Sequence, residues 1–221
     1  MTASLRDCIL AAADAVDAGR DELGRLDAVA GDGDHGLTMA HGARAVRRAL
    51  EENREAPPAD LLAKVAMAMA SIGGAIGPIY ATGLLKTAVA IRASESWDGG
   101  VTVARLLACA DAAVAAVTTL GHAKPGDKTI LDAMTPLAEN LRASEAAGVS
   151  VDEALVRARD AATAGAAATS GMIASIGRAA RLGEQSRGTP DAGATSFAMI
   201  VAAAVDTYLG VGRDHESEAA R

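Results

Sequence analysis

Three aspartates near the start of the chain have the types and spacing of a metal site. Asp32 and Asp34 are two residues apart, and Asp27 precedes them. On a helix, residues two apart point about 200° away from each other, but the glycines of the loop 31–36 permit positive φ and let the carboxylates converge. Three converging carboxylates repel each other unless a cation joins them. Hard oxygen ligands on a tight loop suit Mg²⁺, so the segment predicts a Mg²⁺ site completed by water and phosphate oxygens.

A helix that we expect to begin near Gly36 adds to this site. Its N-terminal amides carry partial positive charge and are aimed at the same place. A metal beside a helix N-terminus is typical of a site for a di- or triphosphate. The alternative is that the Asp-Gly pairs only form turns, and the residues alone leave it open.

Two further glycine-rich segments are candidates for the same site. The loop 73–78 opens a helix and could present backbone N–H groups to phosphates, or it could serve close helix packing. Arg178, after Gly177, could pair with a phosphate or stack on a base, or it could be a solvated surface residue. The segment 191–193 contributes another Asp and Gly.

Other sites with similar patterns are excluded. The glycines of 31–36 match a dinucleotide fingerprint, but a helix is expected where that fingerprint needs a strand. An EF-hand starting at Asp32 fails at Gly36, Leu37 and Ala43. The loop 121–129 approaches a Walker A motif but carries an extra Asp and also lacks the strand. No pair of histidines has the spacing of a zinc site.

Composition favours a helical protein. The 221 residues are 50% hydrophobic, which excludes a disordered chain, and only 2% aromatic, which argues against a β-sandwich. Alanine makes up about a quarter of the chain, which favours helices packed closely through small side chains. A net charge of −7 and a pI near 5.1 argue against binding to nucleic acid or an anionic membrane. Cys8 and Cys109 indicate buried thiols in a reducing compartment, so we expect a cytoplasmic protein without a membrane span.

The hydrophobic periodicity predicts eight helices and no strand. We expect one all-α helical domain over residues 1–211, followed by a flexible C-terminal tail at 212–221. Capping boxes are expected at Ser4 with Asp7 and at Ser150 with Glu153. The predicted helices cover 3–25, 36–52, 59–71, 78–94, 101–120, 127–146, 151–170 and 194–210.

At these segments the sequence resembles the L subunit, the nucleotide-binding subunit, of dihydroxyacetone kinases. The resemblance spans nearly the whole chain and follows the family's order. Its motifs are Leu26-Asp27, Gly-Asp-Gly-Asp-His-Gly at 31–36, Gly-Gly-Ala-x-Gly-Pro at 73–78, Pro-Gly-Asp-Lys-Thr at 125–129, Gly-Arg at 177–178, Leu-Gly-Glu at 182–184 and Asp-x-Gly-Ala-Thr-Ser at 191–196.

The resemblance implies a single-domain antiparallel eight-helix barrel that binds ADP or ATP at one end through two Mg²⁺ ions. Asp27, Asp32 and Asp34 would hold the metals, with no further catalytic residue in this chain. The chain departs from the family at Ile76, where a Ser is usual, and at Ala192, where a Pro is usual. The nucleotide contacts that the resemblance implies are His35, Leu37, Thr38, Ala75, Ile76, Gly121, Ile130, Arg178, Asp191 and Gly193.

The same resemblance implies a partner. The family's ketose is held on a separate K subunit, and this chain shows no segment of that type. We expect a homo-oligomer within a hetero-complex. The phosphoryl source is either exchangeable ATP or a retained ADP recharged by a phosphotransferase-system protein, as in glycerol metabolism. Ile76 leaves two alternatives open: a kinase for a related ketose such as a tetrulose, or a non-catalytic nucleotide-sensing subunit that docks on a regulator or a diverged kinase.

Overall fold

The computed structural model describes residues 3–93 and 100–210, and over these residues it is all-helical, as predicted. The expected tail at 212–221 and the expected end of a helix at Ser94 lie outside the described residues. The α-helices are α1 (Leu5–Ala18), α2 (Arg20–Ala30), α3 (His35–Glu52), α4 (Pro58–Ala70), α5 (Ile76–Ala93), α6 (Val103–Gly121), α7 (Leu131–Ala147), α8 (Val151–Ala168) and α9 (Ala192–Leu209). Two 3₁₀ segments, η2 (Thr169–Gly171) and η3 (Ala179–Ser186), connect α8 to α9.

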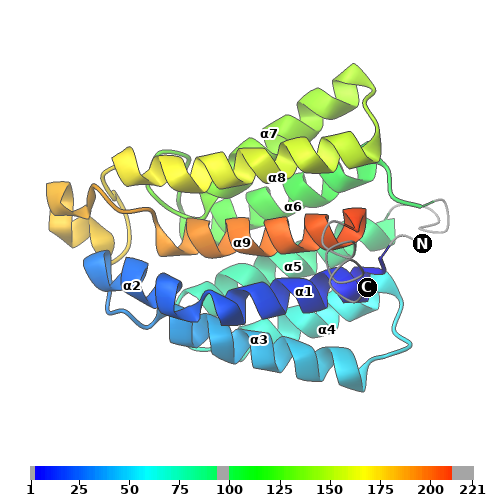
Figure 1. Cartoon of the computed structure of the whole chain (residues 1–221), viewed down its shortest axis with the longest axis horizontal. Helices are drawn as coiled ribbons and strands as arrows, with labels where there is room; N and C mark the ends of the chain where they lie inside the picture. Colours follow the sequence, from blue (N-terminus) through cyan, green and yellow to red (C-terminus); the bar gives the residue numbers. More distant parts are fainter. Residues whose placement is uncertain (1–2, 94–99, 211–221) are drawn as a thin grey trace, which may run out of the picture.

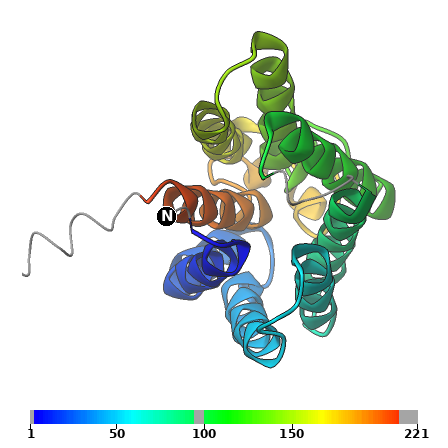
Figure 2. The same cartoon turned by 90° about the vertical axis from the view of Figure 1, so that its right-hand side faces the viewer.

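Eight of the described helices form a closed ring. Helix α1 packs on α3, and from there each helix packs on the next in chain order until α9 packs on both α8 and α1. Figure 1 shows these helices side by side, and Figure 2 shows the ring from one end. Short connections, such as 53–57 and 148–150, make the helices that they join antiparallel. The expected eight-helix barrel is therefore confirmed, with α2 as an addition at one end.

Helix α2 exists because the predicted helix over 3–25 is interrupted at Gly19. A Cβ at Gly19 would come 2.9 Å from Sδ of Met199, so α1 and α9 approach each other closely there. The chain turns at Gly19 and continues as α2 to Ala30, beyond the expected end. Asp27 therefore lies on a helix rather than in the loop that follows.

The start of α7 also differs from the prediction, at Leu131 instead of 127. Two carboxylates stabilise a loop in place of the first helical turn. Oδ2 of Asp127 accepts from the Lys124 amide at 2.8 Å, and Oδ2 of Asp132 accepts from the Thr129 amide at 2.7 Å. Side chains that bond local amides compete with the helix in this way. The expected cap at Ser4 forms a complete capping box, and Ser150 caps α8 by accepting from the Glu153 amide.

Two glycines permit helix approaches that no other residue allows. A Cβ at Gly36 would lie 1.9 Å from the carbonyl oxygen of Arg20, and one at Gly165 would lie 2.2 Å from that of Asp132. Contacts below about 3 Å are sterically forbidden, so both positions require glycine. Gly36 sets the start of α3 against the start of α2, which brings the loop between these helices into a tight turn.

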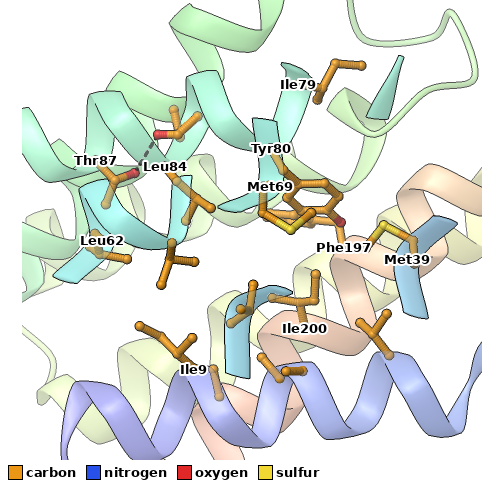
Figure 3. A pocket seen from close by; sticks show the side chains of 18 of the residues that line it. Ile9, Met39, Leu62, Met69, Ile79, Tyr80, Leu84, Thr87, Phe197 and Ile200 are labelled. Carbon is orange, nitrogen blue, oxygen red and sulfur yellow. Dashed lines mark hydrogen bonds between the residues drawn. The ribbon is translucent and has the colours of Figure 1, made fainter. Parts of the chain in front are cut away.

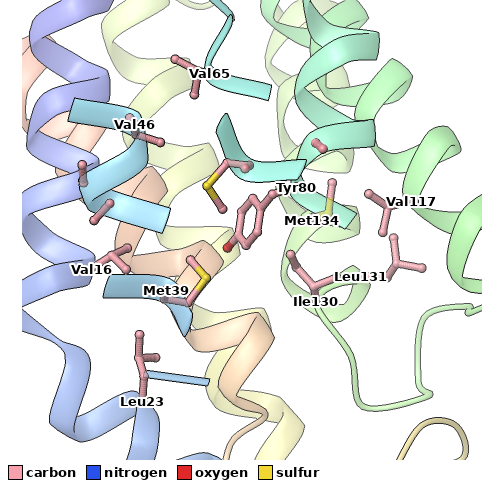
Figure 4. Close-up of a cluster of buried hydrophobic side chains, with 14 of the residues drawn as sticks. Val16, Leu23, Met39, Val46, Val65, Tyr80, Val117, Ile130, Leu131 and Met134 are labelled. Carbon is pink, nitrogen blue, oxygen red and sulfur yellow. The ribbon is translucent and has the colours of Figure 1, made fainter. Parts of the chain in front are cut away.

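The interior of the ring is apolar but not filled. The largest described cluster of buried side chains includes Val16, Leu23, Met39 and Leu131, drawn in Figure 4. Beside it lies a cavity of about 270 Å³ whose lining is almost entirely apolar and includes Ile9, Met69, Tyr80 and Phe197, as Figure 3 shows. Small side chains bring the helices together around the ring but leave this space at its centre.

Helices α6 and α9 are long and apolar enough to cross a membrane by length and composition alone. Each lies between two neighbours in the ring, α6 between α5 and α7, and α9 between α8 and α1. Of the apolar stretch, 22% is buried in α6 and 28% in α9, so packing against neighbouring helices accounts for only part of this composition.

Candidate nucleotide and metal site

A second cavity, of about 390 Å³, lies at the end of the barrel where α2 is found, on the left in Figure 1. Connections distant in sequence form its walls. These are the α2–α3 loop, the start of α5, the α6–α7 loop, the segment 176–179 and the segment 189–193. The glycine-rich segments singled out in the sequence thus meet at one place.

The three aspartates come together at this end. Asp27 belongs to α2, Asp32 to the following loop, and Asp34 is the N-cap residue of α3. One carboxylate oxygen of each lies within 4.8 Å of the other two, with Asp27 partly buried and the others exposed. Gly33, at φ +76°, permits the turn that brings them together. Three convergent hard oxygen ligands with open space beside them fit Mg²⁺, which retains water and phosphate oxygens in its remaining positions.

Arg178 supplies a counter-charge to this cluster. Its guanidinium forms an ion pair with Asp32, and it approaches Oδ1 of Asp34 at 4.0 Å. Arg178 also lines the cavity and is about half exposed. The carboxylate cluster therefore attracts positive charge. The guanidinium of Arg178 lies where a divalent ion and a phosphate would meet.

The start of α3 has the features of an anion site. Its N-cap residue, Asp34, makes no side-chain capping bond, and one carboxylate oxygen of Asp27 accepts from the His35 amide at 3.2 Å. Thr38, on the same first turn, lines the cavity. At α9 the arrangement differs, because Asp191 caps that helix by accepting from the Ala194 amide at 2.7 Å. Of these two helix starts, α3 is the better placed to meet phosphate.

A buried hydrogen-bond chain connects the site to the barrel interior. The Ser196 hydroxyl donates to the Gly193 carbonyl at 3.0 Å and is hydrogen-bonded to Nε2 of His35 at 3.1 Å and to the Tyr80 hydroxyl at 3.2 Å. Burial lowers the pKa of His35, although the nearby Asp27 carboxylate opposes this shift. Burial likewise raises the pKa of Tyr80. His35 is therefore neutral at physiological pH.

A second buried network surrounds Asp191. Burial raises the pKa of Asp191 to about 6, and hydrogen bonding to the Ala194 amide and the charge of Lys128 both oppose this shift. The Lys128 ammonium donates to the carbonyls of Thr169 and Thr189 at 2.7 and 2.6 Å. Lys128 lines the cavity but was not among the predicted site residues. The available signal was a lysine inside the Pro-Gly-Asp-Lys-Thr motif of a chain that has only four lysines.

Most of the predicted contacts line this cavity, and two predicted residues do not. Asp32 belongs to the carboxylate cluster but lies outside the lining, and Leu37 is 53% exposed on α3. Ile79 and Ile176 also line the cavity without having been predicted. The predicted residues found in the lining are Asp27, Asp34, His35, Thr38, Ala75, Ile76, Gly121, Ile130, Arg178, Asp191 and Gly193.

Curated relatives share this chain's sequence over most of its length. The D-erythrulose kinase of Mycolicibacterium smegmatis is 41% identical over 201 residues, covering 89% of this chain but 34% of that protein. The ADP-binding subunit DhaL of the PEP-dependent dihydroxyacetone kinase of Escherichia coli is 36% identical over 177 residues, covering 80% of this chain and 82% of that subunit. This chain thus spans about a third of the erythrulose kinase and most of the length of DhaL.

Solved structures show the same fold. The dihydroxyacetone kinase of C. freundii in its native form matches with a TM-score of 0.68 and 26% identity, over 91% of this chain and 34% of that one. The structure of that enzyme in complex with AMP-PNP and Mg²⁺ matches with a TM-score of 0.69 and 24% identity, over 94% of this chain and 35% of that one.

The DAK2 domain family matches residues 29–206, which include α3 to α8, Asp32 and Asp34 of the carboxylate cluster, and the loops around the cavity. Together with the likeness to DhaL, this match confirms the resemblance to dihydroxyacetone kinase L subunits. The chain belongs to the DAK2 domain family.

Proposed function

We propose that this chain is the nucleotide- and Mg²⁺-binding subunit of a short-ketose kinase. The observation that carries the proposal is the convergence of Asp27, Asp32 and Asp34 within 4.8 Å beside the start of α3. The adjoining cavity of about 390 Å³ has room for a nucleotide. Bound Mg²⁺ would neutralise phosphate charge and hold the terminal phosphoryl group for transfer.

The chain's own part in such a reaction is to position groups and to balance charge. The three carboxylates would hold the metal, the α3 amides and Arg178 would meet phosphate oxygens, and His35 would stay neutral. Phosphoryl transfer requires little covalent chemistry from the protein when its reactants are aligned. No catalytic residue of this chain beyond the metal site is needed for this role.

The ketose and its binding site would come from a partner. The chain spans about a third of the erythrulose kinases it matches, and most of DhaL, which is one subunit of a kinase. We propose a K-type subunit as the partner, in the cytoplasm. Two erythrulose kinases match with identities of 41% and 40%, so a four-carbon ketose is a candidate substrate beside dihydroxyacetone. Either ATP or a retained ADP recharged by a phosphotransferase-system protein would supply the phosphoryl group.

Calorimetric titration of ADP with and without Mg²⁺ tests the binding step. We expect Mg²⁺-dependent binding to wild type and a loss of about tenfold or more in Asp32→Ala, equivalent to about 1.4 kcal/mol or more. Asp21→Ala is the matched control, because Asp21 lies on α2 with its side chain 88% exposed and outside the carboxylate cluster. Equal affinity in wild type and Asp32→Ala would contradict the metal assignment.

Catalysis is tested by nucleotide consumption after mixing with a K-type subunit and a ketose. We expect turnover with erythrulose and K subunit together, and none when either is omitted. The alternative, a nucleotide-sensing subunit without catalysis, rests on Ile76, which lines the cavity beside Gly193 and lacks the hydroxyl usual in the family. Mg²⁺-dependent nucleotide binding without turnover for any K subunit and ketose would favour that alternative.

A further inference from the structure

Lys128 is a buried cation in the loop that precedes α7. It is 5% exposed and has φ +61°, in the left-handed region that residues other than glycine rarely adopt. Lys124, in the same loop, is exposed. Holding an ammonium out of water on a strained backbone is costly, so the surroundings must compensate through specific contacts.

Those contacts join two segments that are distant from Lys128 in sequence. The ammonium donates to the Thr169 carbonyl, at the end of α8, and to the Thr189 carbonyl, just before α9. The Thr169 hydroxyl in turn accepts from the Asp191 amide at 2.8 Å. Lys128 and Asp191 are thus both anchored to Thr169, which is fully buried.

The charge of Lys128 also acts on the Asp191 carboxyl. Burial disfavours the carboxylate, and Asp132 on α7 adds a second negative charge, whereas Lys128 favours the ionised form. Tyr80 on α5 faces Asp191 as a neutral phenol. His35, on α3, contacts α9 at Ser196 and is neutral. The groups that face Asp191 thus include one cation, Lys128. Burial and the nearby charge of Arg187 both lower the pKa of Lys128.

We propose that Lys128 is a positioning residue of the nucleotide site, which fixes Asp191 beside the cavity and keeps its carboxylate charged to accept a hydrogen bond from an N–H or O–H group of the nucleoside. This inference rests on the proposed function, since it assumes that the cavity binds a nucleotide. It assigns to Lys128 an effect on affinity that depends on pH, which a purely structural lysine would not have.

The test compares the affinity for Mg²⁺–ADP of wild type and Lys128→Met by calorimetry from about pH 5 to about pH 9, a range that extends to both sides of the pKa of about 6 that burial gives Asp191. The ratio of the two affinities cancels the protonation of the ligand itself. Without the ammonium, Asp191 should ionise only at higher pH. The ratio should therefore be largest near the wild-type pKa of Asp191 and smaller toward either end of the range, reaching at most about tenfold for a shift of one pH unit.

Two further variants complete the experiment. Lys124→Met removes the same charge from the exposed lysine of the same loop, and its ratio to wild type should stay near one. Asp191→Asn should match wild type at low pH and bind progressively less well as pH rises to about 7, because only wild type gains the charge. Thermal unfolding and helical content show whether each variant is folded.

A ratio for Lys128→Met that is the same at every pH would overturn the proposal, because it would indicate a structural role. A pH-independent ratio for Asp191→Asn would also overturn it, and this variant decides the matter if Lys128→Met does not fold. Failure of wild type to bind Mg²⁺–ADP would refute the proposed function itself.

Discussion

At the scale of single residues, Arg178 has two opposite effects on ligand binding at the carboxylate cluster. In the present structure it neutralises Asp32 and approaches Asp34, which is the place a divalent cation would take. A phosphate bound to that cation would in turn attract the guanidinium, because arginine matches the geometry of phosphate oxygens. Arg178 should therefore compete with the metal when the nucleotide is absent and assist binding when it is present.

This relation predicts opposite effects of one substitution. Arg178→Gln should strengthen binding of Mg²⁺ alone by up to about fivefold, since exposed ion pairs contribute about 1 kcal/mol or less. The same substitution should weaken binding of Mg²⁺–ADP. Calorimetric titration of each ligand measures both effects, and Arg181→Gln, at an exposed arginine of η3, is the control. Weaker binding of both ligands would show that Arg178 does not compete with the ion.

The hydrogen bonds of the Ser196 hydroxyl predict that substitutions at Tyr80 and at Ser196 differ in their cost to stability. Tyr80→Phe removes one hydrogen bond and leaves Ser196 with its bonds to His35 and Gly193, so it should cost about 1 kcal/mol. Ser196→Ala leaves both His35 and Tyr80 without their buried partner and should cost about 1–3 kcal/mol for each unsatisfied group. Urea unfolding gives both values. Equal costs would mean that the three groups do not form one network.

At the scale of helices, local signals in the sequence located most ends and missed those that depend on distant contacts. Ser4 and Ser150 were predicted as caps from spacing alone, and both form caps because capping is local. The helix is interrupted at Gly19, where Met199 of α9 packs, and a single glycine inside a helical pattern reveals neither the break nor this neighbour. Lys128 is hydrogen-bonded to the carbonyls of Thr169 and Thr189, and the motif in its own loop does not indicate these distant partners.

The candidate site was more predictable than its supporting structure. The three aspartates and the glycine-rich segments have local patterns, and the structure gathers these segments around one cavity. The apolar walls, such as Ile79 and Ile176, have no pattern that separates them from core residues. Leu37 illustrates the converse, because a motif match placed it among the nucleotide contacts while its side chain is exposed outside the cavity lining.

The contact between α7 and α8 predicts a large effect of a small substitution. Gly165→Ala would place a methyl group 2.2 Å from the Asp132 carbonyl oxygen, so the helices must separate, at a cost of about 1–3 kcal/mol or more. Gly83→Ala is the matched control within α5, because its nearest neighbour would lie at 3.6 Å. That variant should be stabilised by up to about 1 kcal/mol through helix propensity. Thermal unfolding measures the stability of both variants. A Gly165→Ala variant as stable as wild type would contradict the packing argument.

At the scale of the whole molecule, the ring of helices encloses empty volume. Unfolding eliminates such voids, so pressure should unfold this protein with a volume change of about −20 to −100 mL/mol, scaling with the void. Met134→Ala should enlarge the 270 Å³ cavity, make that volume change more negative, and cost about 2–5 kcal/mol. Met67→Ala, at a position 64% exposed, should change neither quantity greatly. Infrared spectroscopy under pressure measures the transitions, and equal volume changes for the two variants would contradict a void at the centre.

Ile79, Val117 and Ile130 line both the central cavity and the cavity at the end of the barrel. A side chain in a solid core can change rotamer only by displacing its neighbours, because protein interiors are close-packed. These three have free space behind them as well as in front. These three side chains lie between the two cavities and have room to change rotamer. A molecule that binds at the end of the barrel can therefore displace them toward the central cavity while the surrounding helices keep their positions.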